Sequence, residues 1–186
     1  MKRSTDRIRT THTGSLPRPP EILEMMRARE AGQPVDEQAF EEKLAKHVDE
    51  IVRRQVACGI DVVNDGECGK PAFLAYQAEY IGQAKVQRDI RNLKAAMAKH
   101  GVEEGFLPAI APFPTLKNEY YKNDDELRAA YAEVMREEYK AILDAGLLLQ
   151  IDYPQFVSQW DERTGVTLPD YRKWMEAQVE LLNLSL

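Results

Sequence analysis

The residues that could do chemistry lie in short polar segments. Some supply hydrogen-bond donors and others supply carboxylate acceptors. Gly14 and Ser15 place an unhindered backbone amide beside a hydroxyl, a pair that suits a carboxylate or a phosphate. Glu67 and Asp152 are acceptor-only side chains that can bind an ammonium or ligate a metal ion. Considered separately, Gly14 and Ser15 are more typical of a capped turn, and Glu67 and Asp152 are more typical of ordinary surface carboxylates. Taken together, they complement a zwitterionic amino acid, with Gly14 and Ser15 for its carboxylate and the two acids for its ammonium.

The three histidines offer little further chemistry. His12 adjoins the predicted pocket and could carry a proton or ligate a metal, but one histidine without a second nearby ligand is more often a hydrogen-bonded structural residue. His47 and His100 fall within predicted helices and are expected to face solvent. Zinc needs three or four ligands, and no HxC, HExxH or CxxC spacing is present. We therefore expect this chain alone to hold no metal.

Charge and motifs exclude several function classes. The net charge of −6 opposes binding to nucleic acid or to an anionic membrane. No apolar run has the length of a signal peptide or a membrane span, so a cytoplasmic protein is expected. GxGxxG, GxxxxGK[ST] and GxSxG are all absent, which argues against nucleotide binding and a nucleophile elbow. Cys58 and Cys68 are too few for a disulfide scaffold and are expected to be reduced structural thiols.

A helix and a strand are predicted to position Glu67. Residues 36–58 have the pattern of an amphipathic helix that ends at Gly59. The β-rich run 60–63 follows at once and leads into the polar loop 64–67. The apolar stripe of the helix is expected to consist of Phe40, Leu44, Val48, Ile51, Val52 and Val56.

The same arrangement is predicted to position Asp152. Asp124 or Asp125 can cap a helix that ends at Gly146, and residues 147–151 then form a strand closed by Asp152. An aspartate lies six positions after the terminal glycine in both cases, at Asp65 and at Asp152. Two helix-turn-strand units therefore deliver carboxylates to the carboxyl ends of two strands. The stripe of the second helix is expected to be Leu127, Tyr131, Val134, Tyr139 and Ile142.

The remaining pattern indicates a parallel α/β fold. Strands are predicted at residues 7–11 and 105–111, helices at 86–99 and 168–186, and a flexible connection at 27–35. Four strands alternating with at least four helices are typical of a parallel sheet, and a whole (β/α)₈ barrel needs ~250 residues. We therefore expect residues 1–186 to form a single domain, a partial TIM-type barrel of about four strands.

Ligands bind at the carboxyl ends of parallel strands, so these ends set the candidate site. Four segments qualify: residues 12–15, residues 65–67, the loop after Ala111, and Asp152 with Tyr153.

Several stretches, in order along nearly the whole chain, carry a family likeness. They are residues 9–19 (RTTHTGSLPRP), 59–67 (GIDVVNDGE), 118–121 (NEYY), 135–139 (MREEY) and 149–154 (LQIDYP). Together they resemble the short, single-barrel relatives of cobalamin-independent methionine synthase. The resemblance implies that this chain is the N-terminal part of a (β/α)₈ barrel.

The resemblance also implies an activity and roles for site residues. In that family a zinc-bound homocysteine thiolate attacks the methyl group of a methylated folate, a 5-methyltetrahydropteroyl-glutamate–homocysteine S-methyltransferase reaction. Carried over to this chain, Gly14 and Ser15 hold the substrate carboxylate, Glu67 and Asp152 hold its ammonium, and His12 adjoins them. Zinc is implied as cofactor and methylated folate as co-substrate.

Two departures qualify the assignment. The zinc ligands of the family lie in a part that follows the position of Leu186, so none is expected in this chain. A stretch of the family barrel is also expected to be deleted around residues 81–83.

Other functions stay open beside the methyltransferase. One is a related enzyme that alkylates coenzyme M or decarboxylates uroporphyrinogen; a sulfonate would need cations, and Arg18 is the obvious local candidate. Another is a non-catalytic half-barrel that binds a small molecule. Because a half-barrel leaves strand edges open, we expect a homo-oligomer or a chain that supplies the other half.

Overall fold

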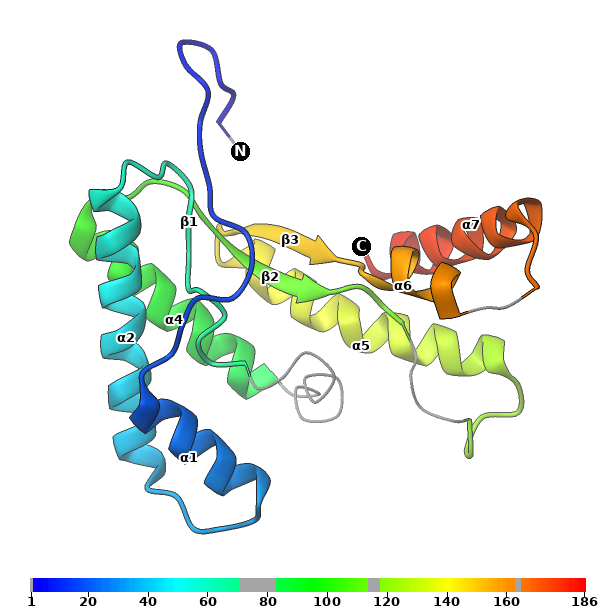
Figure 1. The fold of residues 1–186 in the computed structure, drawn as a ribbon, viewed down its shortest axis with the longest axis horizontal. Helices are drawn as coiled ribbons and strands as arrows, with labels where there is room; N and C mark the ends of the chain where they lie inside the picture. Colours follow the sequence, from blue (N-terminus) through cyan, green and yellow to red (C-terminus); the bar gives the residue numbers. More distant parts are fainter. Residues whose placement is uncertain (1, 71–82, 114–117, 163–164) are drawn as a thin grey trace. The chain divides into compact units, whose positions relative to one another are not determined.

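The computed structural model describes residues 2–70, 83–113, 118–162 and 165–186. They divide into two compact units, Met1–Leu107 with Ala145–Leu148 and Pro108–Asp144 with Leu149–Leu186 (Figure 1). The prediction of one domain stays a prediction, and so does the deletion at residues 81–83, since residues 81 and 82 lie outside the described residues.

Helix α2, Glu37–Ala57, is the main helix of the first unit. It begins where the Asp36 side chain accepts a hydrogen bond from the Ala39 amide (3.0 Å) and ends before Gly59, whose φ is 80°. Five of the six residues predicted for its apolar stripe are buried, and only Val56 is exposed. Helix α2 packs against α1, Pro20–Glu30, and α4, Gln83–His100 (Figure 1).

Three strands form a small parallel sheet. They are β1, Val63–Asn64, β2, Gly105–Ile110, and β3, Leu148–Asp152, in the order β1-β2-β3. In the first unit β1 pairs with the start of β2, with Val63 opposite Gly105. All six residues of β2 are buried, as expected for a strand covered on both faces. The described residues thus form a mixed α/β structure with this sheet and six helices.

The second unit is built on α5, Asp124–Asp144, which packs against α7, Leu168–Ser185. The short helix α6, Gln155–Glu162, precedes α7. The side chain of Asn123, not that of Asp124 or Asp125, caps α5 by accepting from the Glu126 amide (2.9 Å). Tyr139 and Ile142 are buried as predicted, whereas Val134 is exposed because Met135 occupies the inward position.

The predicted strand at residues 7–11 is wrong. Only Thr11 pairs in β fashion, through a single bridge to Val62. Asp61 holds this segment instead: its carboxylate accepts from the Thr10 amide (2.8 Å) and pairs with Arg7. The Arg7 guanidinium keeps the pKa of Asp61 well below its usual range. This segment is therefore held by the Asp61 carboxylate and by the bonds that the Thr10 carbonyl accepts from the Asp61 and Val62 amides, rather than by a strand ladder.

Four further expectations are corrected. Residues 27–30 belong to α1 rather than to a loop. The continuous apolar run at residues 147–151 favours a strand buried on both faces, but β3 is half-buried along its length, since it is the last strand in the sheet order. His47 donates to the Pro17 carbonyl (3.2 Å) and His100 contacts Asp49 (2.8 Å), so neither simply faces solvent. In the described part of the chain, no helix is both long and apolar enough to cross a membrane.

Candidate functional site

Two of the predicted pocket residues meet in the first unit. The Ser15 hydroxyl donates a hydrogen bond of 2.6 Å to Oε2 of Glu67, although the two residues lie 52 positions apart in the sequence. Ser15 precedes α1, and Glu67 follows β1. The Ser15 hydroxyl therefore lies directly beside a half-buried carboxylate that follows the carboxyl end of β1.

Asn64, the last residue of β1, ties these two segments together. Its Nδ2 donates to the His12 carbonyl (2.5 Å), and its Oδ1 accepts from the Gly66 amide (2.7 Å). The buried Gln55 of α2 fixes Asn64 by bonding both its carbonyl (2.8 Å) and its amide (3.1 Å). Asn64 was missed as a site residue, although Asn followed by Asp-Gly is a recognisable turn signal.

The backbone at Gly66 and Glu67 is left-handed, with φ values of 65° and 57°. This conformation is unusual for glutamate and costs roughly 1 kcal/mol, which the surrounding contacts must offset. The Leu16 amide donates to the Gly66 carbonyl (3.0 Å) and so joins the Ser15 segment to this turn. Glu67 is therefore held in its position by the turn and is not a freely moving surface side chain.

His12 and Gly14 also lie in this segment. Nε2 of His12 bonds the Gly14 carbonyl (3.0 Å); a carbonyl only accepts, so Nε2 carries the proton. Gly14 has a φ of 98°, which favours glycine, and a side chain there would meet open space. Both residues thus shape the loop beside Ser15.

A buried acid lies beneath Glu67. Asp65 is 1% exposed; its Oδ1 accepts from the Glu67 amide (3.0 Å), while its Oδ2 has no hydrogen-bond partner among the described residues. Burial, and next the charge of Asp89, raise the pKa of Asp65 to about 6, against an opposing effect of Lys70. Buried Cys68 is close by, and burial likewise raises the pKa of its thiol. Cys68 is therefore a structural thiol rather than a reactive one.

The raised pKa of Asp65 predicts a pH-dependent stability. An acid with a raised folded pKa stabilises the fold while it is protonated, so its contribution is complete below pH ~4 and is lost as pH rises through about 6. Over this window we expect the free energy of unfolding of the wild type to fall relative to that of Asp65→Asn, by at most ~1.4 kcal/mol per pH unit. Denaturant titrations at several pH values measure the difference. Parallel pH courses for the two proteins would contradict the assignment.

Asp152 lies in the second unit, at the end of β3. Its carbonyl accepts from the Ala111 amide (2.9 Å), and its Oδ1 accepts from the Gln150 side chain (2.8 Å). Tyr153 stacks on Phe156, with ring centroids 4.0 Å apart. That Asp152 faces the same ligand as Glu67 stays a prediction.

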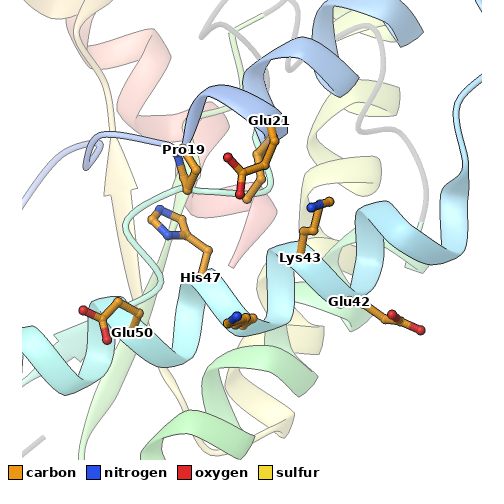
Figure 2. A pocket seen from close by; sticks show the side chains of 8 residues that line it. Pro19, Glu21, Glu42, Lys43, His47 and Glu50 are labelled. Carbon is orange, nitrogen blue, oxygen red and sulfur yellow. The ribbon is translucent and has the colours of Figure 1, made fainter.

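A hollow of about 360 Å³ opens between α1 and α2 (Figure 2). His47 lines it and donates to the Pro17 carbonyl, and burial lowers the pKa of this histidine. Acids and lysines are mixed around it, so it favours no charge of ligand. It contains none of the predicted pocket residues, and its lining consists of Pro19, Glu21, Ile22, Glu42, Lys43, Lys46, His47 and Glu50.

Known proteins are similar to this chain. Residues 8–104 match the family described as cobalamin-independent synthase, catalytic domain. A methionine synthase of Thermococcus kodakarensis is 27% identical over 182 residues, covering 82% of this chain and 54% of the relative. A methionine synthase of Sulfolobus acidocaldarius is 28% identical over 174 residues, covering 78% of this chain and 51% of the relative.

A methionine synthase of Saccharolobus islandicus is also 28% identical, over 174 residues that cover 78% of this chain and 52% of the relative. The chain thus spans about half the length of the curated relatives it matches. The segments that hold Ser15 and Glu67 both lie inside the matched residues 8–104. Because this match covers more than half of the chain, the chain belongs to the family of cobalamin-independent synthase catalytic domains.

Proposed function

We propose that this chain binds the amino-acid end of a homocysteine-like thiol, as the substrate-binding part of a methyltransferase of the methionine synthase type. The hydrogen bond between Ser15 and Glu67 carries the proposal, because it brings a hydroxyl and a carboxylate together at a strand end. The names of the relatives support the choice of methionine synthase chemistry. A cytoplasmic location stays a prediction of composition.

The pair can exchange its internal bond for substrate bonds. The ammonium of the amino acid replaces the Ser15 hydroxyl as donor to Glu67, so that the carboxylate receives a charged donor in place of a neutral one. The released hydroxyl then turns to donate to the substrate carboxylate, assisted by the Gly14 backbone. Asp152 is proposed as the second acceptor for the ammonium. Binding thus orients the substrate through its two charged groups and leaves the thiol to point away.

Zinc and methylated folate belong to the full reaction as the family resemblance implies. Zinc would bind the thiol and lower its pKa. Among the described residues no three His, Cys, Asp or Glu side chains gather to hold a metal ion, so the described part of the chain does not fit zinc. The role proposed for this chain is therefore substrate binding through its own residues.

Calorimetry with matched ligands tests the binding proposal. Homocysteine and methionine carry both charged groups, whereas 4-mercaptobutyrate lacks the ammonium and 3-aminopropanethiol lacks the carboxylate. We expect the two amino acids to bind at least ~10-fold more tightly than either truncated thiol, since each truncation leaves a polar group unpaired. Equal affinities, or no binding of either amino acid, would refute the proposal.

The chain by itself is expected not to methylate homocysteine at a useful rate. A free thiol has a pKa near ~8.5, so without a metal little thiolate is present at neutral pH. Assaying methionine formation from a methylated folate, with and without added zinc, measures this directly. Robust turnover by metal-free protein would contradict the prediction.

A non-catalytic binding protein is the second candidate, favoured because the Ser15–Glu67 pair can bind an amino acid without a metal ion. It shares the amino-acid pocket but needs no metal. Zinc analysis of the purified protein separates the two, because a catalyst of this family needs the metal and a binding module does not.

We also propose that the outer edge of β3 pairs with a further strand, from a second copy or from a chain that supplies the rest of the barrel. Among the described strands β3 has β2 as its neighbour on one side only, and open edges are normally paired or covered. We expect an interface of more than ~1,200 Å². Light scattering at micromolar concentration gives the mass. A 21.3 kDa monomer that unfolds cooperatively would contradict this assembly.

A further inference from the structure

Arg18 donates hydrogen bonds to the loop that carries Glu67. Its Nη2 donates to the carbonyls of Glu67 (2.7 Å) and Lys70 (2.8 Å), and its Nε donates to the carbonyl of Cys68 (3.2 Å). The acceptors are three main-chain oxygens within four consecutive residues. A planar guanidinium suits this task, because its N–H groups form a rigid fork.

Both peptide groups of Glu67 are therefore held by side chains. On the amino side, the Glu67 amide donates to the buried Asp65 (3.0 Å). On the carboxyl side, the Glu67 carbonyl accepts from Arg18 and also from the Lys70 amide (3.1 Å). These bonds fix a residue whose φ of 57° glutamate seldom adopts. The left-handed backbone at Glu67 is thus held by partners in its own loop and by Arg18 from outside that loop.

Arg18 is three residues from Ser15, so one segment supplies both the Ser15 hydroxyl and the guanidinium that holds the Glu67 loop. The Leu16 amide adds a bond between the same two segments, to the Gly66 carbonyl (3.0 Å). Ser15 and Glu67 consequently move as one unit as long as these contacts hold.

We propose that Arg18 is a positioning residue that fixes the Glu67 carboxylate against Ser15 and so sets the preference for ligands with an α-ammonium. This inference rests on the proposed function. It assigns Arg18 a different role from binding an anionic group of the substrate, since Nε and Nη2 bond the loop.

Three variants test the proposal. Arg18→Gln removes the fork and the charge, while Arg18→Lys keeps the charge but cannot reproduce the fork. The control is Arg53→Gln, because Arg53 forms only a surface pair with Glu50 on α2.

Hydrogen exchange measures, without any ligand, how firmly Arg18 holds the loop at residues 66–70. In Arg18→Gln we expect the amides of Glu67 and Lys70 to exchange about tenfold faster, with Arg18→Lys closer to this variant than to the wild type and Arg53→Gln unchanged. Unchanged exchange at residues 66–70 in a folded Arg18→Gln would overturn the proposal that Arg18 holds this loop. If that variant does not fold, the same comparison is made on Arg18→Lys.

Calorimetry reads the consequence for binding. We expect Arg18→Gln to weaken homocysteine about tenfold and to leave 4-mercaptobutyrate, which has no ammonium, within about twofold. An equal loss for both ligands would overturn the positioning role and assign Arg18 to the carboxylate. If the wild type binds no amino acid, the proposed function fails. Faster exchange at residues 66–70 in Arg18→Gln then still supports the statement that Arg18 fixes this loop.

Discussion

Replacing Glu67 with glutamine is expected to weaken the binding of homocysteine by roughly 10- to 100-fold. The amide has nearly the same shape as the carboxylate, but it removes the charge that pairs with the substrate ammonium, and hydrogen bonds to charged groups contribute about 1.5–3 kcal/mol. Titration calorimetry at neutral pH measures the change. Glu24→Gln, on the exposed side of α1, is the matched control and should bind as the wild type does.

A double-mutant cycle extends this test to Asp152. If both acids bind one ammonium, the loss in Glu67→Gln with Asp152→Asn will differ from the sum of the single losses by ~0.5 kcal/mol or more. Strict additivity would indicate that Asp152 does not share the ligand. An unchanged affinity in Glu67→Gln alone would remove the carboxylate from the site altogether.

The sequence predicts best what local chemistry decides. The bounds of helix α2 are predicted nearly to the residue because its cap Asp36, its apolar stripe and the terminal Gly59 all lie in one continuous segment of sequence. The strand at residues 7–11 was wrong for the converse reason. Its β-rich composition is local, but the Thr10 amide donates to the carboxylate of Asp61, some fifty residues away, rather than to a neighbouring strand. Propensity carries no information about such a partner.

The meeting of Ser15 and Glu67 was predictable because their chemical types are complementary, and a single parallel bridge between Thr11 and Val62 brings their segments together although residues 7–11 form no strand. The residues that hold them were not. Gln55, Asn64 and Arg18 act on main-chain atoms, and any residue type offers the same main-chain atoms. Arg18 was therefore considered for a sulfonate, while its actual partners are three carbonyls.

Gly66→Ala is expected to destabilise the fold strongly. An ideal Cβ at this position would lie 2.9 Å from Cδ1 of Ile51 and 3.0 Å from Cβ of Leu16. It would also force alanine into a φ of 65°. The left-handed backbone costs roughly 1 kcal/mol and overpacking roughly 1–3 kcal/mol, so we expect a loss of roughly 2–4 kcal/mol in the free energy of unfolding.

Gly32→Ala separates the two costs. Gly32 has nearly the same φ, 67°, but a Cβ there meets nothing within 4 Å, so only the backbone cost of roughly 1 kcal/mol applies. Denaturant unfolding of both variants gives the difference, which measures how tightly the turn packs between α2 and the Ser15 segment. Because Leu16 adjoins Ser15, Gly66→Ala should also weaken homocysteine binding, whereas Gly32→Ala should not. Equal destabilisation by the two substitutions would show that the turn has room to move, and Glu67 would then lack the rigid support on which its proposed role depends.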